Sequence, residues 1–360
     1  MTKKPAVLVG TTRLFVGLTL ILTLIGLLFV FEASSAEALG MVGDPYFFLK
    51  QQAIRIALGL VLLVVTQYIP FSLWKKVAGA LYIFSILLLI AVFIPGIGLN
   101  LNGASRWISL GGFAFQPVEV VKLSMVLFFA SWLSEHQRLL PLLFLTALPA
   151  LLLVLQPDLG STLVVVAIAF GMYFVAGGKI LKLIGLGSAL TLLLIPVVIF
   201  SPYRMQRLTT FLDPNSDPQG SSFHVRQLII ALGNGGWLGQ GIGNSKQKYF
   251  YIPEASSDSI FAIVAEETGF VGSTVIFGIF ALYLLTATQL VAQQSLDRYA
   301  YLVGSGIVTW VALQWLINIA AVVALVPLTG IPLPFFSYGG SAQIMILTGS
   351  GIIARLRKEA

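Results

Sequence analysis

Asp258 occupies the position in this sequence that most favours chemistry. It follows the run YIPEASS at residues 251–257 and directly precedes a long apolar stretch. A carboxylate at the start of a helix is stabilised in its charged form by the helix dipole, so it can simply cap that helix. At the water-facing end of a membrane helix it can also meet an anionic lipid headgroup and act as a general base. The residue type is compatible with both roles.

Glu119 and Lys122 form a second candidate group at the start of another apolar stretch. Residues three positions apart share one face of a helix, so this carboxylate and this ammonium can form an ion pair. An unpaired charge at membrane depth costs about 2.5 kcal/mol or more, which makes such residues rare. The spacing therefore favours either a structural ion pair near the interface or a substrate site.

Two expected outer turns carry further polar groups. Arg106 stands beside Trp107, so it can anchor at a membrane interface or present its planar guanidinium to a phosphate. In the turn QPDLG at residues 156–160, Asp158 can cap the helix that follows. Each turn thus has a structural interpretation beside a functional one.

Other unusual features lie at membrane depth. Glu266 and Glu267 are about two helical turns beyond Asp258, where an ionisable side chain is a functional hypothesis by default. Their pairing with Arg55 or with polar groups of another span is an open alternative. Segment 327–341 is rich in proline and glycine, and irregular backbone at this depth requires cover by protein or a wet cavity. We expect this segment to line the same cavity as the other candidates.

The composition is that of a membrane protein. Of 360 residues, 58% are hydrophobic and 10% are charged, and the mean hydropathy is +0.95, whereas about a quarter of residues are charged in ordinary soluble domains. About twenty apolar residues span a hydrocarbon core, so this length allows about ten spans. We predict an all-α polytopic membrane protein, a single domain over residues 1–360. The absence of cysteine excludes disulfides, thiolate metal sites and cysteine nucleophiles.

Ten apolar runs are candidate spans. They cover residues 14–31, 53–69, 77–94, 118–133, 139–155, 161–176, 180–200, 260–286, 299–326 and 341–354. Because cytoplasmic loops are enriched in Lys and Arg, the basic residues orient these spans with both termini in the cytoplasm. The short outer loops then hold only Lys50 and Arg106. The net charge of +7 is therefore a topology signal, and its scattered residues do not form the basic stripe of a nucleic-acid binder.

One long extracytoplasmic loop, residues 201–258, separates spans seven and eight. It contains five cations, several glycines and seven aromatic residues, which is unlike a disordered linker. Residues 223–232 have the pattern of a short amphipathic helix lying in the interface. We predict an ordered, functional loop. The two histidines, His136 and His224, are isolated in the sequence and receive no role.

Several motifs occur in one order along the chain. They are NGA and RWI within 102–108, QP with Glu119 and Lys122 within 116–122, QPDLG at 156–160, DPQG at 217–220, PE with Asp258 and IFA within 253–262, the pair Glu266 and Glu267, and segment 327–341. Together these motifs resemble the SEDS family of polytopic cell-wall glycosyltransferases, which includes FtsW, RodA and SpoVE. The sequence GNSKQK at 243–248 is closer to FtsW than to RodA. Ser259 departs from the family, which usually has phenylalanine after the aspartate.

The resemblance implies a peptidoglycan glycosyltransferase. Its substrate would be lipid II, polymerised into glycan strands at the outer face of the bacterial cytoplasmic membrane for cell division or elongation. Its partners would be a class B penicillin-binding protein, which is a transpeptidase, and other divisome or elongasome membrane proteins, with no nucleic acid. The essential aspartate of the family corresponds to Asp258, the expected general base of an inverting transfer from which undecaprenyl pyrophosphate leaves.

A pyrophosphate leaving group needs charge stabilisation rather than a proton, so one carboxylate can suffice. Candidate pyrophosphate contacts are Arg106, Lys122 and Arg207, with Glu119 orienting Lys122. The other expected substrate contacts are Gln156 and Asp158 at the cavity mouth, and Ser337. A divalent cation, magnesium or manganese, could bridge the headgroup and Asp258, although the sequence has no clustered carboxylates that define a metal site.

Two rival functions remain. A lipid II flippase or another transporter also has intramembrane charges and broken helices. Against it, the polar candidates gather at the outer face, and the cytoplasmic half offers no second site for alternating access. A pure scaffold would leave the ionisable residues inside the membrane without an explanation.

Overall fold

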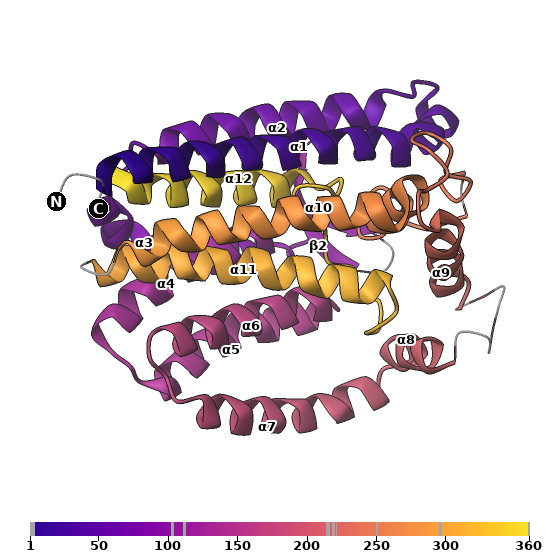
Figure 1. Cartoon of the computed structure of the whole chain (residues 1–360). Coiled ribbons are helices and arrows are strands. Elements are labelled where there is room, and N and C mark those ends of the chain that lie inside the picture. Colours follow the sequence, from indigo (N-terminus) through magenta and orange to yellow (C-terminus); the bar gives the residue numbers. More distant parts are fainter. Residues whose placement is uncertain are drawn as a thin grey trace.

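The computed structural model describes residues 4–101, 104–110, 113–213, 217, 220, 222–249, 251–294 and 297–358. The motif residues Asn102, Gly103, Pro218 and Gln219 lie outside these ranges. Within them the chain forms twelve α-helices, one three-stranded sheet and a short final 3-10 helix (Figure 1). The helices are α1 (Lys4–Val42), α2 (Phe47–Thr66), α3 (Phe71–Ala91), α4 (Pro117–Glu135), α5 (Leu139–Leu155), α6 (Leu159–Val175), α7 (Ile180–Ile199), α8 (Pro202–Leu212), α9 (Phe223–Gly235), α10 (Ile260–Ala292), α11 (Arg298–Val322) and α12 (Gly340–Arg355), followed by η1 (Leu356–Lys358).

The ten predicted spans correspond to α1 to α7 and α10 to α12. Six of the described helices are long and apolar enough to cross a membrane, and three more are shorter apolar helices. Both termini lie at one end of the bundle, and α8 and α9 lie at the other (Figure 1). The predicted polytopic helical fold is confirmed. Two helices exceed their predicted ends, since α1 continues to Val42 and α10 to Ala292.

Helix α4 runs through the interior of the bundle, and most of its side chains are buried. Neighbouring helices approach closely where a small residue faces them. At Gly351 of α12, an added β-carbon would lie 2.1 Å from the Thr66 hydroxyl oxygen of α2. Small residues at helix contacts let backbones pack tightly in a membrane, where no hydrophobic effect drives helix association. Glu119 and Lys122 of α4 are among the residues buried in this bundle.

A small antiparallel sheet replaces part of the expected loop between spans three and four. Its strands are β1 (Gly98–Leu101), β2 (Ala104–Leu110) and β3 (Phe113–Phe115), in the order β1-β2-β3. Pairing of Ile108 with both Gly98 and Phe115 fixes the register. The sheet was not predicted, because strands this short give little periodicity. It places Arg106 on the central strand.

The long extracytoplasmic loop is ordered over its described residues, as predicted, and the expected amphipathic helix is α9. The part of this loop that follows α9 docks into a break in α10 at Gly269, where φ is +66°. An added β-carbon at Gly269 would lie 2.3 Å from the Gly239 nitrogen, so only glycine fits this close approach. The amide nitrogens of Phe270 and Val271 donate to the carbonyls of Gly236 and Trp237, at 2.9 and 3.0 Å. The loop thereby satisfies backbone groups that the broken helix leaves open.

Candidate active site

A cavity of about 690 Å³ lies between α6, α8, α11 and the segment that follows α11. Its walls are mainly apolar, and three of the predicted site residues, Arg106, Asp158 and Arg207, line it. The other lining residues are Pro157, Leu159, Gly160, Leu163, Ala167, Leu208, Leu316, Ile317, Ala320, Val326, Pro327, Leu328 and Thr329. Pro327 to Thr329 confirm that the irregular segment contributes to this wall. The cavity thus combines a long apolar surface with two guanidinium groups.

The turn between α5 and α6 holds Arg106 in place. The Arg106 Nε donates to the Gln156 carbonyl at 3.2 Å, and a second guanidinium nitrogen donates to the Pro157 carbonyl. The Gln156 side-chain amide instead donates to the Leu89 carbonyl at 3.0 Å. Asp158 caps α6, because one carboxylate oxygen accepts the Ser161 amide at 3.0 Å. Gln156 and Asp158 therefore shape the site mainly by positioning its backbone.

Arg207 connects the cavity to Asp258. It projects from α8, and its guanidinium donates to the Leu328 carbonyl at 2.8 Å in the cavity wall. Its positive charge acts to lower the pKa of Asp258, so the two side chains interact electrostatically. A guanidinium in this position can attract an anionic headgroup to the vicinity of the carboxylate.

Asp258 is half-buried just before α10 and is not among the residues that line the cavity. Burial and the nearby Glu254 carboxylate raise the pKa of Asp258 to about 6, against the opposing effects of Arg207 and Ser259. Its backbone carbonyl accepts the Asn318 amide of α11 at 2.7 Å. The capping position of α10 belongs to Ser259, and no side chain caps that helix. The helix-cap interpretation of Asp258 is therefore wrong.

His224 is a site residue that the sequence analysis missed. Its Nε2 atom lies 2.9 Å from the Ser259 hydroxyl, which in turn donates to an Asp258 carboxylate oxygen at 3.3 Å. Burial and the charge of Arg207 lower the pKa of His224 to about 4. The amphipathic pattern of 223–232 predicted the helix that carries His224, but nothing in the sequence pairs it with a residue 35 positions away.

Glu119 and Lys122 form an ion pair at 2.7 Å, with each side chain 1% exposed. Lys122 also donates to the Gln314 side chain at 2.7 Å and lies 5.5 Å from the centre of the Trp310 ring. The Gln314 side-chain amide donates a hydrogen bond to the Pro332 carbonyl at 2.9 Å. Neither Glu119 nor Lys122 is among the residues that line the cavity, which favours the structural interpretation.

Ser337 is buried and ties two irregular segments together. Its hydroxyl accepts the Leu333 amide at 2.6 Å and donates to the Ser257 carbonyl. The neighbouring Tyr338 amide donates to the Ser256 carbonyl at 2.7 Å. Both bonds hold the segment after α11 against the residues that precede Asp258. This geometry gives Ser337 a supporting position, and its predicted substrate contact stays a prediction.

The family is shown by comparison with known proteins. A family model for FtsW, RodA and SpoVE, described as "Cell cycle protein", matches residues 12–360. The chain belongs to the SEDS family. It is 40% identical over 361 residues to a probable peptidoglycan glycosyltransferase FtsW of Thioalkalivibrio sulfidiphilus, covering 96% of this chain and 90% of that protein. It is 37% identical to stage V sporulation protein E of Bacillus subtilis, covering 96% of each.

Two solved structures share the fold of this SEDS chain. One is a chain from work on the structural coordination of polymerization and crosslinking by a peptidoglycan synthase complex, with 30% identity and a TM-score of 0.79. The match covers 96% of this chain and 97% of the chain in that complex. The other is the rod shape determining protein RodA of Thermus thermophilus, with 28% identity, a TM-score of 0.70 and 96% of each chain covered.

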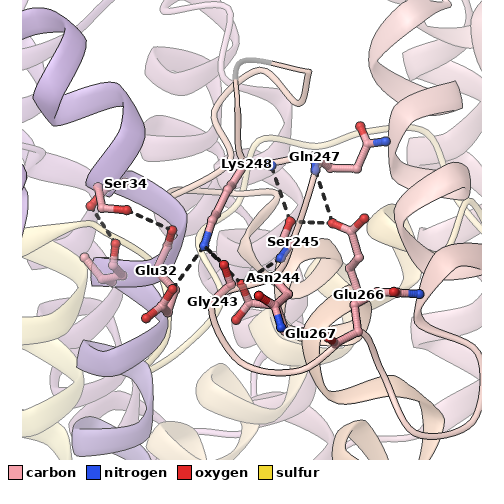
Figure 2. Close-up of polar contacts among 12 residues, drawn as sticks. Glu32, Ser34, Gly243, Asn244, Ser245, Gln247, Lys248, Glu266 and Glu267 are labelled. Carbon is pink, nitrogen blue, oxygen red and sulfur yellow. Dashed lines mark hydrogen bonds and ion pairs between the residues drawn. The ribbon is translucent and has the colours of Figure 1, made fainter.

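A second polar cluster of the SEDS chain anchors the long loop to α1 and α10. Figure 2 shows Lys248 between Glu32 and Gly243, with Ser245 next to Glu266 and Glu267. The Lys248 ammonium lies 3.1 Å from the Glu32 carboxylate and 3.4 Å from that of Glu267.

The two buried glutamates therefore pair with the loop and, through it, with α1. Pairing with Arg55 is wrong, because the Arg55 guanidinium lies over the Tyr338 ring at 5.0 Å and donates to Gln51 at 3.3 Å. The direct partners of the two glutamates come from the long loop and not from another span, as Asn234 of the loop helix α9 also donates to Glu266 at 3.1 Å.

The expected divalent cation has no defined ligand set in the part of the chain that the structure describes. No group of three or more His, Asp or Glu side chains there could hold a metal ion. The positive charge of Arg207 already acts on Asp258 and lowers its pKa. The described residues thus supply no site built from protein ligands alone, and the chemistry below is derived from the side chains of the protein.

Proposed function

We propose that this SEDS protein is a peptidoglycan glycosyltransferase that polymerises lipid II at the outer face of the bacterial cytoplasmic membrane. The observation that carries the proposal is the placement of Arg207, which lines the apolar cavity and interacts with Asp258. An undecaprenyl chain fits apolar walls, a pyrophosphate fits two guanidinium groups, and a carboxylate nearby fits a general base. The names of the FtsW relatives support the same activity.

The reaction needs few groups. An acceptor sugar hydroxyl attacks the anomeric carbon of the donor, so a new C–O bond forms as the bond to the lipid pyrophosphate breaks. Asp258 accepts the hydroxyl proton, and the configuration at the anomeric carbon inverts. Arg106 and Arg207 stabilise the negative charge that develops on the leaving pyrophosphate. Preorganised cations are effective here because the apolar walls keep the local dielectric low.

The experiment that tests this function is reconstitution with a class B penicillin-binding protein, the proposed transpeptidase partner. The solved synthase complex that resembles this chain supports such a partner. We expect glycan strands from lipid II on a gel, insensitive to moenomycin. A complex in which the transpeptidase is active but no glycan forms, together with lipid II flipping in liposomes, would favour a flippase instead.

Arg207→Ala should raise the KM for lipid II by about 10- to 100-fold, since a hydrogen bond to a charged group contributes about 1.5–3 kcal/mol. It should also move the acidic limb of the pH–rate profile to higher pH, because Arg207 lowers the pKa of Asp258. The KM of Arg207→Lys should lie between those of the unmodified protein and of Arg207→Ala, because an ammonium keeps the charge but lacks the planar fork of a guanidinium. Steady-state kinetics over a pH series measures both effects.

The exposed cation Lys246 of the same loop supplies a matched control, and Lys246→Ala should leave KM unchanged. A lowered Tm with normal KM in Arg207→Ala would mean that Arg207 only ties α8 to Leu328.

A further inference from the structure

Three side chains from two parts of the fold form a hydrogen-bonded row that ends at Asp258. His224 comes from α9, Ser259 from the capping position of α10, and Asp258 from the end of the long loop. The Nε2 of His224 and the hydroxyl oxygen of Ser259 are 2.9 Å apart, and that oxygen is 3.3 Å from Oδ1 of Asp258. Ser259 is buried, with 1% of its surface exposed.

The Ser259 hydroxyl is not used by the helix that it begins. A serine at this position commonly accepts an amide hydrogen from the first turn, yet this side chain makes no capping hydrogen bond. Its hydrogen-bonding capacity is directed to Asp258 and His224 instead. The serine therefore serves the carboxylate rather than α10.

Counting protons gives the direction of the row. An ionised carboxylate only accepts, so the single hydroxyl hydrogen of Ser259 goes to Asp258. The hydroxyl oxygen must then accept a hydrogen from Nε2 of His224, which fixes the tautomer of the ring. Each bond polarises the next one, which strengthens the donation to the carboxylate.

We propose that Ser259, itself oriented by His224, is a positioning residue that holds the carboxylate of Asp258 for proton abstraction. This inference rests on the proposed function, in which Asp258 is the base. Neither residue touches the substrate in this account, and His224 acts only through the Ser259 hydroxyl.

The two oxygens of Asp258 then have different tasks. Oδ1 accepts from Ser259, while Oδ2 faces Gly330, where an added β-carbon would lie 3.7 Å away. Gly330 directly follows Thr329 in the cavity wall. Fixing Oδ1 therefore leaves Oδ2 next to the cavity wall, free of the Ser259 hydrogen bond.

Asp258 lies among charged groups, whereas the His224 and Ser259 side chains of the row are uncharged at neutral pH. The charged and titratable groups that face it are Arg207 from α8, His224 from α9 and Glu254 from its own loop, whereas α11 contributes the neutral amide of Asn318. With its pKa lowered to about 4, His224 is uncharged at neutral pH and acts as a hydrogen-bond donor rather than a counter-ion.

The test is a double-mutant cycle in the polymerisation assay. Ser259→Ala should lower kcat about tenfold and leave the KM for lipid II nearly unchanged. The acidic limb of the pH–rate profile of this variant should move to higher pH, because the Asp258 carboxylate loses a donor that stabilises its charge. His224→Leu should change kcat and the acidic limb in the same direction. The double variant should be no slower than Ser259→Ala, since His224 acts through the serine.

Matched variants separate positioning from folding. His224→Gln keeps a side-chain N–H donor and should restore most of the rate, whereas His136→Leu, at a histidine stacked on Trp132 in another part of the chain, should have no effect. Additive losses in the double variant, or an unchanged pH profile in Ser259→Ala, would overturn the inference. Activity that survives Asp258→Asn would instead overturn the assignment of the base.

Discussion

Asp258→Asn should abolish glycan synthesis and leave the folded protein intact. The amide keeps the shape of the carboxylate and can still accept the Ser259 hydroxyl, but it takes up a proton far too weakly to act as a base. A positioned general base contributes about 10²- to 10⁴-fold to rate, so gel-resolved product should fall by at least that range. Asp258→Glu should retain little activity, because its extra methylene displaces the carboxylate, and a displacement of about 1 Å can cost about 10²-fold.

The pH dependence follows from the raised pKa of Asp258. A base must be ionised, so the rate of the unmodified protein should rise with pH through about 6. Ionisation of Asp258 has the opposite effect on stability, because it lowers the free energy of unfolding. The pKa is higher in the folded protein than the ordinary value of about 3.9, so the charged form costs stability at neutral pH and the neutral asparagine does not. Asp258→Asn should therefore raise Tm above about pH 6, and this gain should vanish near pH 4.

A near-normal rate in Asp258→Asn would move the base elsewhere. Glu254 would then be the first candidate, since its charge already acts on Asp258 from the same loop. Asp158 and Glu266 are weaker candidates, because Asp158 caps α6 and Glu266 is fully buried in the cluster that anchors the long loop.

The spans could be predicted from the sequence because lipid imposes a simple rule. About twenty apolar residues must follow one another in each span, and the runs are visible without any tertiary information. The sheet that carries Arg106 follows no such rule, since β3 has only three residues and its pairing depends on contacts between strands. The break at Gly269 was also not predicted, because it forms only when the loop around Gly239 docks there.

The site residues that could be predicted are those whose charge alone suggests a role. Arg106, Asp158 and Arg207 were singled out as polar residues of outer segments, and they meet at one cavity. His224 was missed because its partner, Ser259, is distant in the sequence and neither residue carries a charge at neutral pH. For Lys122 the predicted substrate contact stays a prediction. Its charge suggested a substrate contact, but Gln314 of α11 and Glu119 enclose it.

Lys122→Ala and Glu119→Ala should each destabilise the protein strongly. Removing one partner of a buried ion pair leaves the other charge uncompensated, which costs about 3–5 kcal/mol. The loss of stability should be especially large for Lys122→Ala, because one Glu119 oxygen already has no hydrogen-bond partner among the described residues. Thermal unfolding of the purified protein should show a lower Tm for both variants.

The double variant Glu119→Gln, Lys122→Met decides between a structural pair and a substrate site. It removes both charges and nearly preserves side-chain volume, so it should recover most of the lost Tm, as neutral replacements of buried pairs commonly do. If the pair is structural, the recovered protein should also bind lipid II with nearly normal affinity, because neither Glu119 nor Lys122 lines the cavity. Recovery of Tm with affinity still reduced tenfold or more would restore Lys122 to the pyrophosphate site.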